Sequence, residues 1–164
     1  MLTSVMKRRF FRYHDHLLAY MDTLEEVAGH LDAADEPGIE FQKYEGLLSE
    51  FVQFMKTRES QHEIEEEKVL LPAIEALIEP GTIPGISIDR MIQDHRWAGT
   101  LVLELEEAMS RLSAKGGGEC TPYRIFAKRL QELIWHFRRH IGEENSFILP
   151  LADRIFEQDG ESAP

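Results

Sequence analysis

The sequence predicts an all-α protein built as an antiparallel up-down-up-down four-helix bundle. Glycine and proline concentrate around Pro37-Gly38, from Pro80 to Gly85 and from Gly116 to Gly118, and these breaks divide the chain into four long segments. In each segment apolar residues recur at steps of three and four, which is the spacing of a helix face buried in a bundle. Short connections between the segments make neighbouring helices antiparallel.

The first two helices are predicted from about Ser4 to Leu31 and from about Ile39 to Ile78. We call the row of residues that faces the bundle interior the seam of a helix. The seam of the first helix comprises Phe10, His14, Leu17, Met21, Leu24, Ala28 and Leu31. The second seam is less regular, because Arg58 or Glu59 interrupts it, and comprises Leu48, Met55, His62, Glu66, Val69, Ala73 and Ala76. Pro72 lies within this pattern, where it should kink or end the helix.

The third and fourth helices are predicted from Ser87 to about Ser113 and from Thr121 to about Phe156. Thr121 favours a helix start, because threonine caps free backbone donors and the proline that follows it is tolerated in the first turn. The third seam comprises Ile88, Met91, His95, Ala98, Val102, Leu105, Met109 and Leu112, and the fourth Phe126, Leu130, Leu133, Phe137, His140, Glu144, Phe147 and Leu151. Pro150 should kink or end the fourth helix, as Pro72 does the second.

Composition indicates one globular domain over residues 1–164, made of a helical hairpin at about 4–78 and another at about 87–156, since 43% of the residues are hydrophobic. The net charge of −12 argues against nucleic acid or an anionic membrane as the partner. No apolar run approaches the roughly 20 residues that cross a bilayer, and the basic start lacks the apolar stretch of a secretory signal. The single cysteine, Cys120, fits a reducing compartment, so we expect a cytoplasmic protein.

The two halves of the chain repeat one another. A Leu-Glu-Glu triplet begins ten residues after His14, and the same triplet begins ten residues after His95. The pattern His-x3-Glu-x5-Pro begins at His62 and recurs at His140. The chain is therefore interpreted as a duplicated helix pair.

Every predicted helix carries a histidine on its seam, and in two helices a glutamate follows one turn later on the same face. Buried ionised glutamates are costly without a compensating charge, and the seam offers only Arg58 as a cation. A single histidine on an apolar face is more often a hydrogen-bonded core residue, but this much unpaired polarity would destabilise an empty core. Metal ions would supply the missing charge, and imidazole and carboxylate donors without a thiolate favour iron, manganese or zinc.

If Glu66 and Glu144 both bridge, two metal ions would receive four protein ligands each, from four imidazoles and four carboxylate oxygens. An oxo or hydroxo bridge would add a fifth ligand. An octahedral ion would keep a position for dioxygen, nitric oxide or peroxide.

At these residues the sequence resembles the hemerythrin family, specifically the bacterial HHE cation-binding domains, whose signature is H…HxxxE…H…HxxxE. The matching residues, which span almost the whole chain, are His14, His62, Glu66, His95, His140 and Glu144. The resemblance implies an antiparallel four-helix bundle with a carboxylate-bridged non-haem centre of two iron ions. Members of the family bind dioxygen or respond to oxygen, nitric oxide, redox state or iron supply.

The sequence departs from the oxygen-carrying hemerythrins at two positions. Gly99 stands where they have a fifth histidine, and Asn145 stands where they have an aspartate ligand. Oxygen transport is therefore not the expected role. His136 is the first candidate for a replacement ligand, followed by Glu63 and His16. A solvated side chain is the alternative interpretation for His136. For Glu63, Glu65, Glu67 and Glu143 a solvated acidic helix face is the preferred interpretation, and extra ligands are the alternative.

The leading hypothesis is a di-iron protein that binds or senses a small molecule, since the sequence shows no catalytic acid or nucleophile beyond the metal ligands. A di-iron peroxidase or oxidase, or an iron-handling protein, is the enzymatic alternative, and a metal-free interaction module is the third. Ferritin-like chemistry is disfavoured because it uses two Glu-x-x-His motifs, and this chain has only Glu59-x-x-His62. Trp97 and Trp135 lie off the seam, where they could form a subunit interface, as in a homodimer, or be partly buried.

Overall fold

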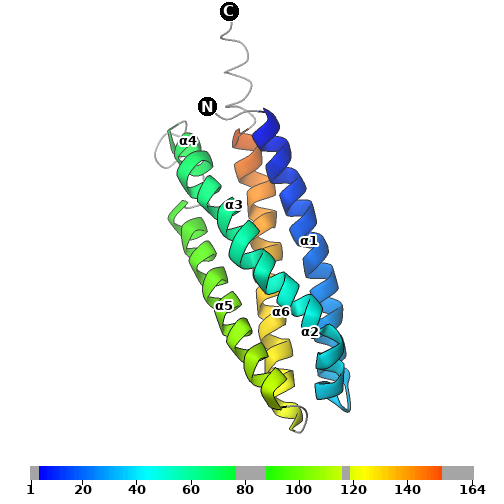
Figure 1. Ribbon diagram of the computed structural model, residues 1–164. Coiled ribbons are helices and arrows are strands. Elements are labelled where there is room, and N and C mark those ends of the chain that lie inside the picture. Colours follow the sequence, from blue (N-terminus) through cyan, green and yellow to red (C-terminus); the bar gives the residue numbers. More distant parts are fainter. Residues whose placement is uncertain (1–3, 77–87, 116–118, 153–164) are drawn as a thin grey trace, which may run out of the picture.

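Four long helical rods run side by side through the computed structural model, which describes residues 4–76, 88–115 and 119–152 (Figure 1). The first rod is α1 (Ser4–Ala33) and the third is α5 (Ile88–Lys115). The second comprises α2 (Pro37–Phe54), the π-helical turn η1 (Met55–Glu59), α3 (Ser60–Glu65), the π-helical turn η2 (Glu66–Leu70) and α4 (Leu71–Glu75). The fourth comprises α6 (Cys120–Glu143) and the π-helical turn η3 (Glu144–Ile148). The predicted all-α four-helix bundle is confirmed.

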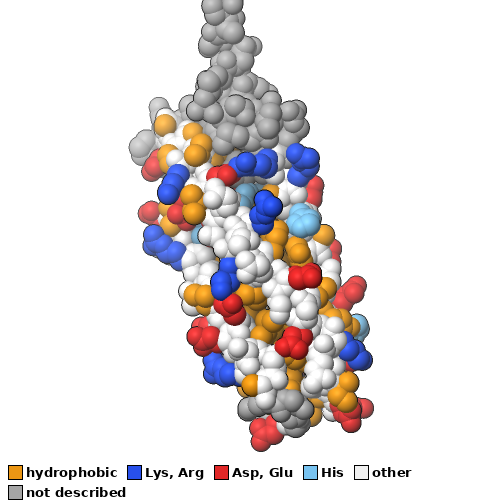
Figure 2. Space-filling view, viewed as in Figure 1, with side chains coloured by type: hydrophobic (Ala, Val, Ile, Leu, Met, Phe, Trp, Pro, Cys, Tyr) orange, Lys and Arg blue, Asp and Glu red, His pale blue; other side chains and the backbone are white. Residues whose placement is uncertain are grey.

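The helix boundaries agree with the sequence where the structure describes them. The fourth rod begins at Cys120, one residue before the predicted start, which places Pro122 in its first turn. The predicted boundaries at Ile78, Ser87 and Phe156 lie outside the described residues. No helix in the described part of the chain is long and apolar enough to cross a membrane. Acidic and basic side chains are interspersed with apolar ones over the face shown in Figure 2.

Two apolar clusters fill the bundle, one on either side of a polar layer. The larger cluster includes Leu24 and Leu130, which are completely buried, and it extends along α1, α2, α5 and α6. The smaller cluster gathers around Leu70, Met91 and Ile148 at the other end of the described bundle. The buried histidines and glutamates of the seams lie between them, so apolar packing encloses the polar layer from both ends.

The seam shifts by one residue at the π-helical turns η2 and η3. Strict helical spacing predicts Val69 and Phe147 in the core, but these side chains are 37% and 46% exposed, and the next residues, Leu70 and Ile148, are buried instead. The prediction for these two seam positions is therefore wrong. A π-helical turn accommodates one extra residue, which moves every later side chain around the helix axis.

Each of these turns lies just before a proline, and its position has a physical reason. Pro72 and Pro150 lack a backbone N–H, and their rings crowd the carbonyl group four residues earlier, which lies within η2 or η3. A wider turn relieves that crowding. Helical structure continues past both prolines, so they alter the local helix without ending it.

Candidate metal centre

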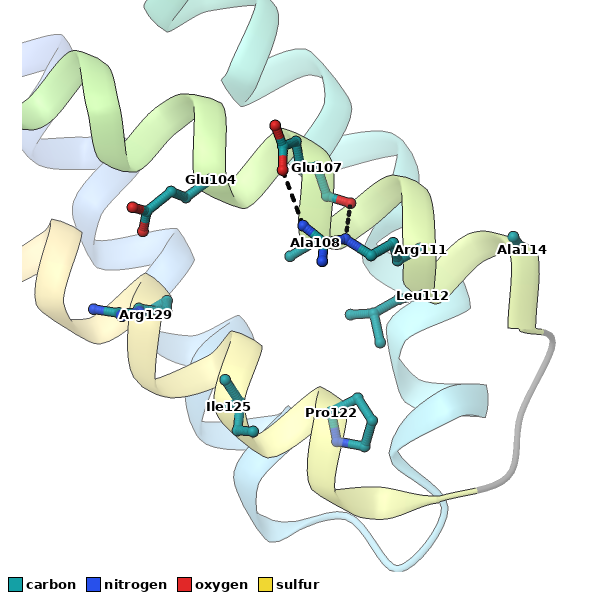
Figure 3. A pocket seen from close by; sticks show the side chains of 9 residues that line it. All are labelled: Glu104, Glu107, Ala108, Arg111, Leu112, Ala114, Pro122, Ile125 and Arg129. Carbon is teal, nitrogen blue, oxygen red and sulfur yellow. Dashed lines mark hydrogen bonds and ion pairs between the residues drawn. The ribbon is translucent and has the colours of Figure 1, made fainter.

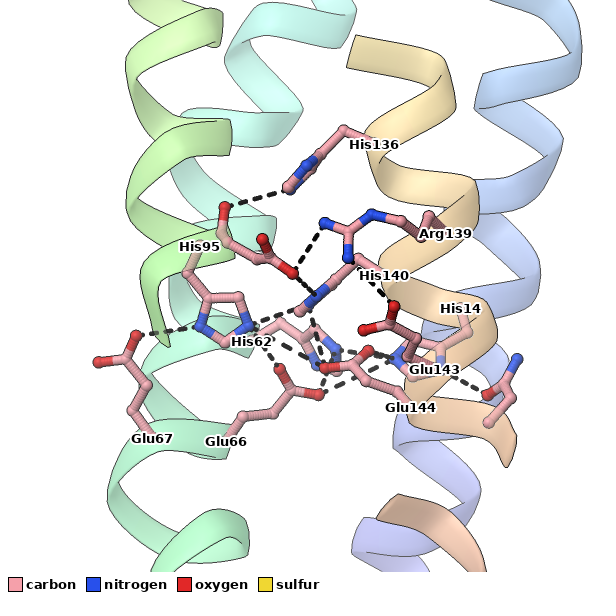
Figure 4. A network of polar contacts seen from close by, with 12 residues as sticks. His14, His62, Glu66, Glu67, His95, His136, Arg139, His140, Glu143 and Glu144 are labelled. Carbon is pink, nitrogen blue, oxygen red and sulfur yellow. Dashed lines mark hydrogen bonds and ion pairs between the residues drawn. The ribbon is translucent and has the colours of Figure 1, made fainter. Parts of the chain in front are cut away.

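The six side chains of the HHE pattern are all buried and converge in one polar layer (Figure 4). They come from all four helical rods, and the most exposed of them, His62, is only 8% exposed. The residues are His14, His62, Glu66, His95, His140 and Glu144. The helices therefore bring together every side chain that the sequence predicts as a core ligand.

Four donor atoms surround what we call the first position. The Nε2 atoms of His14 and His62 lie 3.2 Å apart. Oε1 of Glu66 lies 3.1 Å from Nε2 of His62, which precedes it by one turn. Oε2 of Glu144, from the opposite half of the chain, lies 3.2 Å from Nε2 of His14.

The second position has the same composition. The Nε2 atoms of His95 and His140 lie 3.1 Å apart. Oε1 of Glu144 is 3.1 Å from Nε2 of His140, and Oε2 of Glu66 is 3.4 Å from Nε2 of His95. Each glutamate thus offers one oxygen to each histidine pair, which is the arrangement of a carboxylate that bridges two ions.

The spacing of these donors fits metal coordination. With metal–nitrogen bonds of about 2.1 Å, two nitrogens lie roughly 3.0 Å apart at a right angle and roughly 3.4 Å apart at a tetrahedral angle. The two imidazole pairs, at 3.2 and 3.1 Å, fall between these two values. Four imidazoles and two shared carboxylates are also donors that iron, manganese and zinc accept. The buried residues therefore fit two metal ions.

The buried histidines and glutamates shift one another's pKa values. Burial lowers the pKa of His14 and of His95, but contacts with the carboxylates of Glu66 and, for His14, Glu144 outweigh it and raise each pKa to about 10. Burial raises the pKa of Glu66, yet the imidazoles of His62, His14 and His95 hold it well below its usual value. A bound cation would release the histidine protons, since only neutral imidazole coordinates a metal.

Two outer hydrogen bonds orient histidines of the cluster, and a third histidine has a longer outer contact. Nδ1 of His14 lies 2.9 Å from Oδ1 of Asn145, and Nδ1 of His95 lies 3.0 Å from Oε1 of Glu67. Nδ1 of His140 is 3.7 Å from a carboxylate oxygen of Asp94, too far for a hydrogen bond. Such partners fix the orientation of a ligating imidazole and raise its basicity.

Glu67 lies on a partly solvated face, since its side chain is 33% exposed, but its carboxylate also contacts His95. The internal duplication carried a signal for this residue. Glu67 directly follows Glu66 just as Asn145 directly follows Glu144, so the two positions correspond. In each case the side chain reaches the histidine of the opposite half.

Tyr13 and Glu59 form a second feature that the sequence did not reveal. The Tyr13 ring stacks on His62, with ring centroids 4.1 Å apart and an angle of 26° between the planes. The Tyr13 hydroxyl and Oε2 of Glu59 are buried without a hydrogen-bond partner among the residues that the structure describes. Burial raises the pKa of the Glu59 carboxyl, which favours its neutral form.

The proposed replacement ligands lie outside the two groups of donors. Nε2 of His136 donates to the carbonyl oxygen of Asp94 at 3.1 Å, and burial lowers the pKa of His136 to about 4 (Figure 4). Burial and the nearby Glu59 raise the pKa of Glu63 to about 8. His16 is exposed, and its ring lies against aromatic residues of α1 and α2. Gly99 is exposed as well, with no atom within 4 Å of an added Cβ.

A surface pocket of about 700 Å³ lies elsewhere, between the C-terminal end of α5 and the N-terminal end of α6 (Figure 3). Its described lining combines the apolar residues Leu112, Pro122 and Ile125 with charged side chains such as Glu107 and Arg111, which form an ion pair at 2.9 Å. None of the six converging side chains belongs to this lining. The pocket is therefore separate from the metal centre.

Comparison with known proteins agrees with the residue pattern and its geometry. A curated relative, the iron-sulfur cluster repair protein YtfE of Cronobacter sakazakii, is 26% identical over 155 residues, which cover 92% of this chain and 66% of the relative. The chain thus spans slightly less than two thirds of that relative's length. No solved structure matches. The hemerythrin HHE cation-binding domain matches residues 6–152, and the chain belongs to this family.

Proposed function

We propose that this protein is a non-haem di-iron protein that binds or senses dioxygen, nitric oxide or peroxide in a redox, oxygen or iron response. One observation carries the proposal: Glu66 and Glu144 each present one oxygen to each histidine pair. In this reading the six buried side chains are the protein ligands, and an oxo or hydroxo group completes the bridge. His136 and Glu63 are not part of the proposed ligand set, because their side chains lie outside both groups of donors.

The similarity to a protein named for iron-sulfur cluster repair supports iron over zinc. The imidazole nitrogens have spacings between those of a right angle and of a tetrahedral angle, so these distances do not distinguish the two metals. Manganese accepts the same donors and the same geometry, so metal analysis has to distinguish it from iron. When bound, the ions would supply Lewis acidity and reversible electron transfer to a small ligand.

The chain's own contribution is to hold the donors and to limit access by water. Apolar clusters border the polar layer at both ends, and the ligand side chains are almost completely buried. Such an enclosure favours a ligand as small as a diatomic gas or peroxide. It leaves little room for a larger substrate.

Elemental analysis of freshly purified protein, with its near-ultraviolet and visible spectrum, tests the centre. We expect two iron ions per chain in the wild type and in His136→Ala, and fewer than two in His95→Ala. His136 is a matched control, because it is a buried imidazole one turn from His140 whose Nε2 is bonded elsewhere. The sensing role is tested by anaerobic reduction followed by exposure to oxygen, nitric oxide or peroxide. An iron-loaded protein whose spectrum responds to none of them would refute that role.

Iron handling is the second candidate, and the similarity to a protein named for iron-sulfur cluster repair supports it. An iron-handling protein should release its iron to a competing acceptor, such as a chelator or an apo iron-sulfur protein, on reduction. A peroxidase or oxidase should instead turn over peroxide or dioxygen with a reductant while keeping its metal. Iron retention and turnover, measured on the same sample, separate these outcomes.

Two further proposals concern the setting of the protein. We expect it in the cytoplasm, which fractionation of the native host would test. We also propose a homodimer that uses Trp97 and Trp135, whose side chains are 42% and 65% exposed. Sedimentation of the wild type and of Trp135→Ser would test it, since the variant should shift toward the monomer.

A further inference from the structure

The inner ligands of the two positions are nearly equivalent. Each position has two imidazole nitrogens, at 3.2 Å in the first and 3.1 Å in the second, and one oxygen from each glutamate. These pairwise distances favour neither position, although the second is the more compact. Its four donors all lie within 4.8 Å of one another, and at the first position only those of His14, His62 and Glu66 do so.

The outer hydrogen bonds break this equivalence. Nδ1–H of His95 donates to the carboxylate of Glu67 at 3.0 Å, whereas Nδ1–H of His14 donates to the neutral amide oxygen of Asn145 at 2.9 Å. The two acceptors occupy corresponding positions of the duplicated unit and make contacts of nearly equal length. Their difference is one of charge.

A carboxylate acceptor has a stronger effect on an imidazole than an amide has. Hydrogen bonds that involve a charged partner are roughly twice as strong as neutral ones. A carboxylate on the outer nitrogen raises the basicity of the ligating nitrogen and fixes the ring in the tautomer that presents Nε2 to a metal. The Glu67 side chain is 33% exposed, so solvent screens its charge in part, but the direct contact with His95 remains.

Three other carboxyl groups lie near the histidines in the described part of the centre, and none of them reverses this difference. Glu63 acts on His95 and His140, which both belong to the second position. Asp94 approaches His140 without a hydrogen bond, and Arg139 offsets its charge at 2.9 Å. On the other side, Glu59 lies near His62, but burial favours the uncharged form of its carboxyl group. Of the outer nitrogens of His14, His95 and His140, the one of His95 is thus the one that donates a hydrogen bond to a charged group.

We infer that the second position, at His95 and His140, is the stronger cation site and that Glu67 is the positioning residue that makes it so. A single divalent ion occupies this position first, and the first position fills only afterwards. The inference rests on the proposed two-metal centre and adds an order of filling to it.

Crystals of the full chain with one equivalent of Co²⁺ locate the ion directly by anomalous diffraction. In the wild type we expect the higher cobalt occupancy at the second position. Outer partners of this kind typically change metal affinity by about 10–100-fold, so Glu67→Gln should remove the preference. The exchange variant Glu67→Gln/Asn145→Asp should move the higher occupancy to the first position. In solution, competition with a chromophoric chelator should show that Glu67→Gln raises the lower of the two cobalt dissociation constants.

The exchange is well suited to this test, because both substitutions preserve side-chain shape and lie at partly or fully exposed positions. Glu143→Gln serves as a control for the loss of one negative charge nearby, since Glu143 contacts Arg139 and not a ligand histidine. It should leave the occupancy ratio unchanged. Equal occupancy in the wild type, or a preference for the second position that survives the exchange, would overturn the inference. Failure to bind cobalt at all would remove the two-metal centre itself.

Discussion

The two helical hairpins carry the same inner ligands but surround them with different side chains. In the first half Tyr13 directly precedes His14, and its ring lies beside His62. In the second half Asp94 directly precedes His95, and its carboxylate lies beside His140. Glu59 stands three residues before His62, and Phe137 three residues before His140, and both are buried. The inner residues are of the same types in both halves, and each half contributes a carboxylate oxygen to both positions. The residues around them differ in charge and polarity.

The largest expected effect comes from a side chain that serves both positions. Glu66→Gln should weaken binding at both by more than about 100-fold, since it removes a direct ligand and outer partners alone account for about 10–100-fold. Glu144→Gln should do the same, because its oxygens are shared in the same way. Metal content after dialysis against a chelator measures this. Retention of two ions by either variant would show that its carboxylate does not bridge.

Substitutions at Glu59 and Phe137, the corresponding buried positions of the two halves, should change the free energy of unfolding in opposite directions. Phe137→Ala should lower the free energy of unfolding by about 3–5 kcal/mol, because it opens a cavity in the larger apolar cluster. Glu59→Leu should raise it by about 1–3 kcal/mol, because it removes a buried polar group with an unpartnered oxygen. Urea denaturation of the metal-free protein measures both.

Glu59→Gln is the control for the second change, since it keeps a polar group in the same place but removes the ionisable one. It should bring little gain at pH 4 and only the pH-dependent part of the gain at pH 8. The pKa of Glu59 is raised on folding, so its stabilising contribution exists at low pH and is lost as pH rises. The gain from Glu59→Leu should therefore be larger at pH 8 than at pH 4. A gain that does not depend on pH would contradict burial of an ionisable group as the cause.

The two halves should contribute alike to the pH dependence of the stability of the metal-free protein. The pKa values of His14 and His95 are raised to about 10 from an ordinary value near 6.5. Their contribution to the stability of the metal-free protein is therefore complete below pH 6.5 and is lost as pH rises toward 10. Metal affinity should rise over the same interval, because binding releases these protons.

Chemical denaturation and metal titration at several pH values would measure these opposite trends. His14→Ala and His95→Ala should each reduce the slope of metal-free stability against pH by a similar amount. A slope that only one of them reduces would show that the halves differ in their inner electrostatics as well as in their surroundings.

The smallest expected effect concerns the ion pair that holds Asp94. Arg139→Gln gives the second half the residue type that the first half has at Gln61, one residue before its second histidine. It frees the Asp94 carboxylate to approach His140, now 3.7 Å away. We expect cation affinity at the second position to rise by less than about tenfold, below the range of a full outer hydrogen bond. Cobalt competition measures the change, and a loss of affinity would contradict it.

The four helices, most of their buried faces and the convergence of four histidines and two glutamates could be predicted from the sequence. These features follow from local periodicity and from the duplicated His-x3-Glu pattern, which the sequence contains in full. The one-residue shift to Leu70 and Ile148 required the folded structure, because strict helical spacing does not reveal the extra residue of a π-helical turn.

Tertiary structure also decided which outer residues matter. Glu67 reaches His95 across 28 residues of sequence and Asn145 reaches His14 across 131, so no local pattern could pair them. The same holds for the Tyr13 ring on His62 and for the turn of His136 toward a backbone carbonyl. Helical periodicity places a side chain on the inner face of its own helix. Which partner it meets there depends on how the four helices pack, and that packing gives the two equivalent positions unequal surroundings.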